Sequence, residues 1–140
     1  MFYIQASAAI TSETMKEITD LAEKVKIGLK IQYDNEGVKF VEGFIERNKV
    51  QIPKEDWGGL INSCGAFLGQ SIIENYGGEW VKEENGQISI AFDEKNKIYP
   101  FSKTTKQFQS GLEDSIHSMF TMIPGVFKLQ PKTKKKWWKF

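Results

Sequence analysis

The sequence has few of the residues that bind metals or form disulfides. Its 140 residues include one cysteine, Cys64, and one histidine, His117. A single cysteine excludes an internal disulfide, and one residue of each kind excludes the usual zinc ligand sets. A chain of this length buries enough apolar surface to fold without such a staple. We therefore expect a domain held together by apolar packing, with no cofactor.

Long apolar runs are also missing, since no window approaches the roughly 18 consecutive apolar residues of a membrane-spanning helix. Apolar residues make up 40% of the chain and charged residues 26%, a mixture typical of soluble globular domains. The first residues, MFYIQASAAI, lack the positive start of a secretory signal, and Gln5 and Ser7 interrupt their apolar stretch. These features predict a mature N-terminus and a cytoplasmic protein.

The net charge of +1 conceals an uneven distribution along the chain. Residues 128–140 hold six lysines and no acid, which leaves 13 basic against 18 acidic residues in 1–127. We predict a single acidic domain over residues 1–127 and a basic aromatic tail over residues 128–140. Phosphate attraction supplies most non-specific affinity for nucleic acids, so an acidic body suits a basic protein partner better.

Three N-terminal segments repeat apolar residues every three or four positions, which predicts three helices. They cover 12–30 with Thr11 or Ser12 as cap, 36–48 with Asp34 or Asn35 as cap, and 53–76 before Gly77-Gly78. The third segment has the widest apolar stripe, so we expect it to be the central buried helix. Gly65 and Gly69 lie on one face of it and would let another backbone approach closely.

After Gly78 the sequence pattern changes to that of strands. Asn85-Gly86 is a strong hairpin signal, and it predicts an antiparallel meander of residues 79–84, 87–92 and 98–101. Pro100 would place the third strand at an edge, since proline cannot donate to a ladder. A fourth helix is expected from about residue 102 to Met122, ended by Pro124-Gly125. The fold class is α+β, with three N-terminal helices, a three-stranded meander and a C-terminal helix.

Cys64 and His117 are the only residues that could pair as nucleophile and base. Cys64 lies on the apolar stripe of the third helix, where packing is favoured over reactivity. The acidic pairs Glu83-Glu84 and Asp93-Glu94 fall at turns, where charged side chains are usually solvated. No phosphate-binding glycine loop or calcium loop is present. We predict that the protein is not an enzyme.

Two aromatic features have both a structural and a binding interpretation. Trp80 follows Gly77-Gly78, where a helix gives way to a sheet, so its ring is expected to fill that junction with its N–H on a carbonyl. Stacking on a ligand is the alternative. The tail combines lysines with aromatic residues, a pattern that suits solvation, docking on the acidic body, a protein partner, single-stranded nucleic acid or an anionic membrane. Its candidate contact residues are Lys134, Lys135, Lys136, Trp137 and Trp138.

Four short motifs stand out in the stretch 60–124: GAFLGQ at 65–70, YGGEW at 76–80, PFSK at 100–103 and GLEDSI at 111–116. Together they resemble a bacterial domain family of unknown function. They are similar to the family's "GAyLGE…GGeW" signature, from which Gln70 departs. Members look like small cytoplasmic proteins encoded beside secreted polymorphic toxins, which implies an immunity role and supplies no catalytic residues.

These observations predict a non-catalytic, immunity-type protein that neutralises a cognate toxin by occlusion. Its predicted contact surface is the acidic edge of the meander, which consists of Glu79, Glu83, Glu84, Asp93 and Glu94. The alternative is a nucleic-acid or anionic-membrane accessory protein that acts through the tail. A third hypothesis, an enzyme that uses Cys64 with His117, predicts rapid labelling of the thiol in the folded protein.

Overall fold

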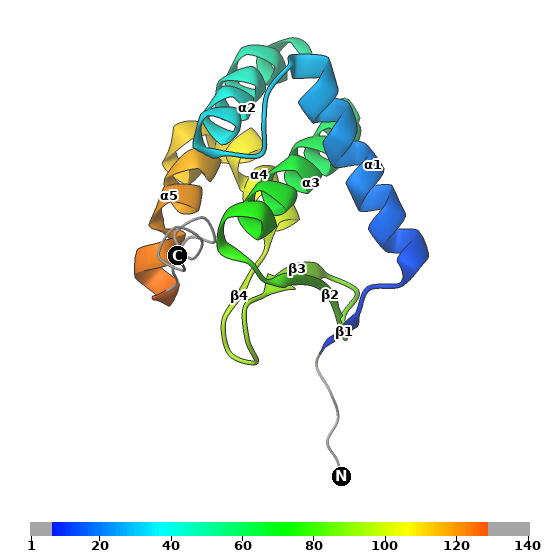
Figure 1. Cartoon of the computed structure of the whole chain (residues 1–140). Helices are drawn as coiled ribbons and strands as arrows, with labels where there is room; N and C mark the ends of the chain where they lie inside the picture. Colours follow the sequence, from blue (N-terminus) through cyan, green and yellow to red (C-terminus); the bar gives the residue numbers. More distant parts are fainter. Residues whose placement is uncertain (1–6, 129–140) are drawn as a thin grey trace.

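The computed structural model describes residues 7–128 of the chain, with side chains from Ile10 onward. It confirms the α+β class (Figure 1). A long helix, α3, lies in the middle of the other helices, and an antiparallel sheet lies at one end of them. One core cluster includes residues of every α-helix and of strands β2 and β3, so a continuous apolar interior joins helices and sheet.

The first two helices begin where local capping signals place them. Helix α1 covers Ser12–Leu29, and the Thr11 hydroxyl accepts a hydrogen bond from the backbone N–H of Thr14. Helix α2 covers Asn35–Asn48, and the Asp34 carboxylate accepts one from the backbone N–H of Gly37 at 2.8 Å. Each cap satisfies a backbone donor that the first helical turn leaves free.

Helix α3 covers Trp57–Tyr76 and is the central buried helix, as predicted. The short 3₁₀ turns η1, Lys49–Gln51, and η2, Lys54–Asp56, precede it, so the helix starts four residues later than the proline suggested. Gly65 admits both the ring and the backbone of Phe101, since a Cβ there would lie 2.5 Å from the ring and 3.3 Å from Cα, as the predicted backbone approach requires. Gly69 instead receives an aromatic ring, because a Cβ there would lie 2.0 Å from the Trp80 ring.

The sheet that residues 7–128 form has four antiparallel strands in the order β1-β2-β3-β4. They are Ser7–Ala9, Glu79–Glu83, Ile88–Ala91 and Lys97–Ile98. The predicted meander is present, and β1 is an additional strand that the sequence did not indicate. Because β1 has three residues and pairs with β2, which is about 70 residues away in the chain, no local pattern identifies it.

The segment predicted as a third meander strand ends early. Strand β4 stops at Ile98, and Pro100 is the first residue of helix α4, Pro100–Ser110. Assigning Pro100 to an edge strand was therefore wrong. A proline at the first helical position costs no hydrogen bond, because the backbone N–H that it lacks would have no helical acceptor there.

The single C-terminal helix that we expected is two helices. Gly111, at φ +73°, ends α4 and starts the 3₁₀ turn η3, Gly111–Asp114. Helix α5, Ile116–Phe127, then begins with the Ser115 hydroxyl as cap. Pro124 does not stop it but lies inside its last turns. A proline there removes one hydrogen bond, and the helix continues for only three more residues.

Candidate protein-binding surface

Helix α5 has an unusual composition for a helix at the surface. Its residues, IHSMFTMIPGVF, include no Asp, Glu, Lys or Arg, and only His117, Ser118 and Thr121 are polar. A helix with so few polar residues is normally covered over most of its surface. Ile116, Phe120 and Ile123 are buried in the core. In contrast, Met122 is 58% exposed and Val126 is 61% exposed. One apolar face of α5 is therefore uncovered.

This uncovered face borders a groove with a volume of about 410 Å³. Met119, Met122 and Val126 line it from α5, and their spacing of three and four puts them in one stripe. Ile98 and Leu112, which lie outside α5, also line it, and Leu112 is 61% exposed. Large exposed side chains gathered at one site mark interaction surfaces more often than free surface.

A second hollow, of about 480 Å³, continues the first, because both include Ile98, Lys103 and Met119. Lys97, Lys103 and Lys106 line this second hollow, which has no acidic lining residue. The one carboxylate in either lining is Glu113, on the side of the first hollow. We call the two hollows together the α5 groove, which has an apolar floor and a basic end.

The structure separates the five acidic residues that the sequence assigned to one edge. Strand β2 pairs with β1 on one side and with β3 on the other, so it is not an edge strand. Glu79 lies at the end of the sheet where β3 leads into the loop with Asp93 and Glu94, while Glu83 and Glu84 lie at the opposite, hairpin end. Four residues of strand put about 13 Å between these groups.

Glu83 is engaged within the fold. Its carboxylate accepts hydrogen bonds from the Ser89 hydroxyl at 2.9 Å and the Tyr99 hydroxyl at 3.4 Å, and pairs with the Lys97 ammonium at 3.3 Å. These contacts, with the Ser89 bond as the largest contribution, lower the pKa of Glu83 below its ordinary value. The side chain stabilises the end of the sheet and is only 14% exposed.

Asp93 also has a structural role. Its carboxylate accepts hydrogen bonds from the Asn96 side chain and from the backbone N–H groups of Lys95 and Asn96, each at 2.8 Å. These bonds lower the pKa of Asp93 and close the loop between β3 and β4. Asp93 is itself exposed, but its carboxylate is engaged in these bonds. The other exposed carboxylates among the predicted contact residues are Glu79, Glu84 and Glu94.

Cys64 has the buried setting that we favoured. Cys64 is 1% exposed, and burial raises the pKa of its thiol to about 12. A thiol in this setting is protonated at neutral pH and is a poor nucleophile. The His117 ring lies on α5 with Nε2 2.9 Å from Oδ1 of Asn35, at the start of α2.

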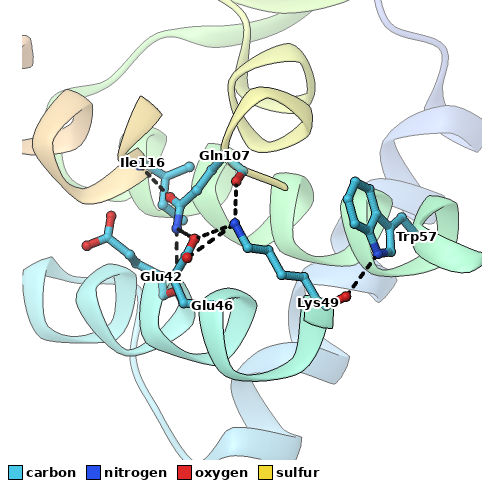
Figure 2. Close-up of polar contacts among 6 residues, drawn as sticks. All are labelled: Glu42, Glu46, Lys49, Trp57, Gln107 and Ile116. Carbon is cyan, nitrogen blue, oxygen red and sulfur yellow. Dashed lines mark hydrogen bonds and ion pairs between the residues drawn. The ribbon is translucent and has the colours of Figure 1, made fainter. Parts of the chain in front are cut away.

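A partly buried polar cluster that the sequence did not reveal links α5 to α2 and α4 (Figure 2). The side chain of Gln107, fully buried on α4, donates to the Glu46 carboxylate at 2.9 Å. Its amide oxygen accepts from the backbone N–H of Ile116 at 2.8 Å. The Lys49 ammonium contacts Glu46 at 3.2 Å and the backbone oxygen of Gln107 at 3.3 Å. Helices α2, α4 and α5 are thus joined by one hydrogen-bond network.

A second carboxylate of α2 holds the N-terminus of α5. Glu42 accepts hydrogen bonds from the Ser115 hydroxyl and, at 3.2 Å, from the backbone N–H of His117. A negative charge at a helix N-terminus is favourable. These bonds orient α5 so that its uncovered face points into the groove. An isolated glutamine or glutamate in a helix gives no sequence signal for such a network.

Trp80 fills the junction between helix and sheet, as predicted. It is 2% exposed, and its ring packs against Phe101 with centroids 5.6 Å apart. The indole N–H donates to the side-chain oxygen of Gln70 at 2.8 Å. Gln70 is the position that departs from the family signature, and here its neutral amide supplies the acceptor carbonyl.

Within residues 7–128, no group of three or more His, Cys, Asp or Glu side chains is placed to hold a metal ion. The helices described there are too short or too polar to span a bilayer. The tail residues Lys134, Lys135, Lys136, Trp137 and Trp138 lie outside the described residues. In comparisons with protein-family models, curated proteins and solved structures, nothing matches this chain. The family resemblance of residues 60–124 stays a prediction.

Proposed function

We propose that this chain is a non-catalytic, immunity-type binding protein that neutralises a cognate bacterial toxin by covering part of its surface. The observation that carries this proposal is the α5 groove, where Leu112, Met122 and Val126 are each more than half exposed. Burying such side chains against a partner is favourable, at about 25 cal/mol per Å² of apolar surface.

The groove would form the centre of the contact rather than the whole of it. A stable interface buries about 800 Å² on each partner, with an apolar centre and a polar rim. Lys106 and Glu113 border the groove and would belong to that rim. Glu79, Glu84 and Glu94 remain a second predicted contact, in two groups, whose effect would fall mainly on association rate.

Affinity purification of the intact protein from its source cells, washed at moderate salt, tests this function. We expect one stoichiometric protein, lost with the double variant Met122→Gln/Val126→Gln and retained with Ile27→Gln, which changes an exposed residue on α1. The recovered protein should also inhibit growth when expressed alone, and the wild-type chain should suppress that inhibition. Recovery without toxicity, or suppression by the groove variant, contradicts the proposal.

The Glu79→Gln/Glu84→Gln/Glu94→Gln triple variant tests the acidic residues separately. It should slow association with the same partner and leave the dissociation rate nearly unchanged, because exposed charges act mostly on encounter. If the triple variant fails to bind at all, the main contact surface is formed by these acidic residues and not by the α5 groove.

The tail supports a competing function, because residues 128–140 contain six lysines and two adjacent tryptophans. Lysine with stacking aromatics suits single-stranded nucleic acid or an anionic membrane surface. That function predicts that the same purification recovers nucleic acid, measured by absorbance, which is lost as salt rises. It also predicts loss of binding in the Trp137→Ala/Trp138→Ala variant, with no effect of the groove variant.

A further inference from the structure

We propose that the α5 groove binds an acidic amphipathic helix of a partner protein. This inference rests on the proposed protein-binding function and specifies the chemistry of the segment that is recognised. Three features of the groove lead to it, namely its shape, its apolar floor and the charge at its basic end.

The shape suits a helix. The groove follows α5 from Ser115 to Phe127, a distance of about 18 Å at 1.5 Å per residue. A partner helix of about three turns would cover that length, with apolar side chains at positions i, i+3 or i+4, and i+7. Met119 and Met122 on the floor are flexible, polarisable side chains that adapt to such knobs.

The charge of the groove selects acidic residues. At its basic end, Lys97 pairs with Glu83 and Lys103 with Asp114, both at 3.3 Å. Lys106 is exposed on α4 and lines the same hollow, and it makes no ion pair among residues 7–128. A carboxylate of a partner helix placed there would pair with the Lys106 ammonium, beside two ammonium groups whose charge Glu83 and Asp114 already offset. A basic segment would find no acidic lining residue in that hollow.

The same charge argues against the chain's own tail as occupant. Residues 129–140 follow α5 directly and contain five lysines and no acid. Placing that segment along the groove would bring its lysines toward Lys97, Lys103 and Lys106. Like charges at close range disfavour binding, so an acidic segment from another protein fits better.

Selection from a displayed library of random 16-residue peptides, on the full-length protein at moderate salt, tests this inference. The Met122→Gln/Val126→Gln variant serves as counter-target. Peptides that bind the wild type and not this variant should be rich in Asp and Glu, with apolar residues three or four apart. Groove-dependent peptides that are basic or uncharged, or no groove-dependent peptide at all, would overturn the inference.

A synthetic copy of the strongest groove-dependent peptide then tests the role of charge by fluorescence anisotropy. Lys106→Glu should weaken its affinity about tenfold, which corresponds to about 1.4 kcal/mol. Lys24→Glu, which makes the same charge change at an exposed position on α1, should leave it unchanged. Equal affinity for the wild type and Lys106→Glu would refute recognition by charge. Circular dichroism of each variant checks that the fold is intact.

Two further measurements distinguish other occupants. Sedimentation of the full-length protein alone should show a monomer, and a dimer that only the groove variant dissociates would assign the groove to a second copy. The Trp137→Ala/Trp138→Ala variant should bind the peptide as the wild type does, whereas tighter binding would show that the tail competes for the groove. If acidic peptides are selected but purification recovers no toxin, the groove chemistry is upheld and the immunity function is rejected. If a toxin is recovered but no acidic peptide is selected, the immunity function is upheld and the groove chemistry is rejected.

Discussion

Replacing Gly69 by alanine is expected to destabilise the protein, although alanine is the better helix former. A Cβ at this position of α3 would lie 2.0 Å from Cη2 and 2.3 Å from Cζ2 of Trp80. The ring has little room to move, because Trp80 is 2% exposed and packs against the Phe101 ring. Its indole N–H also donates a hydrogen bond to the Gln70 side chain at 2.8 Å. The helix or the sheet must shift to admit the methyl group.

The expected size follows from two opposing effects. Alanine in place of glycine inside a helix contributes about 1 kcal/mol of stability. Overpacking a well-filled core costs about 1–3 kcal/mol and more for severe overlap, and an overlap of this depth belongs at the upper end. We expect a net loss of about 2 kcal/mol. With a urea dependence of about 2 kcal/mol per molar, the unfolding midpoint would fall by about 1 M.

Urea titration followed by far-ultraviolet circular dichroism measures this loss. Gly59→Ala is the matched control, because Gly59 lies in the first turn of the same helix and a Cβ there would meet nothing within 4 Å. It should leave stability unchanged or raise it by up to about 1 kcal/mol. If Gly69→Ala is as stable as the wild type, the Trp80 ring does leave room for a Cβ at position 69, and the reasoning is refuted.

A Trp80→Phe background extends the test. The two atoms that overlap with the added Cβ belong to the six-membered ring of the indole, which the shorter phenylalanine side chain does not place there. Gly69→Ala should therefore cost less in this background than in the wild type, and the difference is the coupling between the two positions. Equal costs in both backgrounds would assign the loss to some other contact.

Three other predictions concern the buried residues Gln107 and Cys64 and the partly buried Glu83. Gln107→Leu should cost about 1–3 kcal/mol in urea titrations, because the buried N–H of Ile116 loses its acceptor. Glu83 has a folded-state pKa below its ordinary 4.5, so its contribution is present above that pH and is lost as pH falls through the lowered value. Acid titrations of stability should thus be less steep for Glu83→Gln. Cys64, whose pKa is raised to about 12 by burial, should react with a disulfide reagent far faster in urea than in the folded protein.

The first two of these predictions have matched controls, one on α4 and one in the loop between β3 and β4. Gln109→Leu changes an exposed glutamine of α4 and should alter stability little, so equal losses at positions 107 and 109 would contradict the network. Glu94→Gln changes an exposed carboxylate. If the stability of Glu94→Gln depends on acid pH as weakly as that of Glu83→Gln, the contacts of Glu83 do not account for the effect. Rapid labelling of Cys64 in the folded protein would instead support the hypothesis of an enzyme that uses Cys64 with His117.

Helices α1, α2 and α3 were predictable because their signals lie within a few residues of each other. The apolar residues of each recur within one or two turns, and Thr11 and Asp34 cap backbone groups three residues away. The hairpin at Asn85-Gly86 was equally local, and Gly86 takes the positive φ of +90° that such a loop needs. Such features persist in almost any tertiary context.

The errors fall where a local signal has two valid structural outcomes. Pro100 suits both a strand edge and the first residue of a helix, and the packing of α4 on α3 favours the helix. Pro124 is compatible with a helix that ends one turn later. Gly111, at φ +73°, interrupts a continuous helical pattern, and the N–H of Ile116 beyond it donates to the side chain of Gln107, a contact that no local signal announces.

The sequence alone determined the class of the fold, the central position of α3 and the absence of charged side chains from residues 116–127, since these follow from composition and short-range periodicity. Only the tertiary structure decided that one apolar face of α5 is buried and the other borders a groove. It also decided that Glu83 is engaged at the end of the sheet and Asp93 in the loop between β3 and β4, and that β1 adds a fourth strand. Those outcomes depend on contacts between segments far apart in the chain, and periodicity within a segment carries no information about which neighbour will cover it.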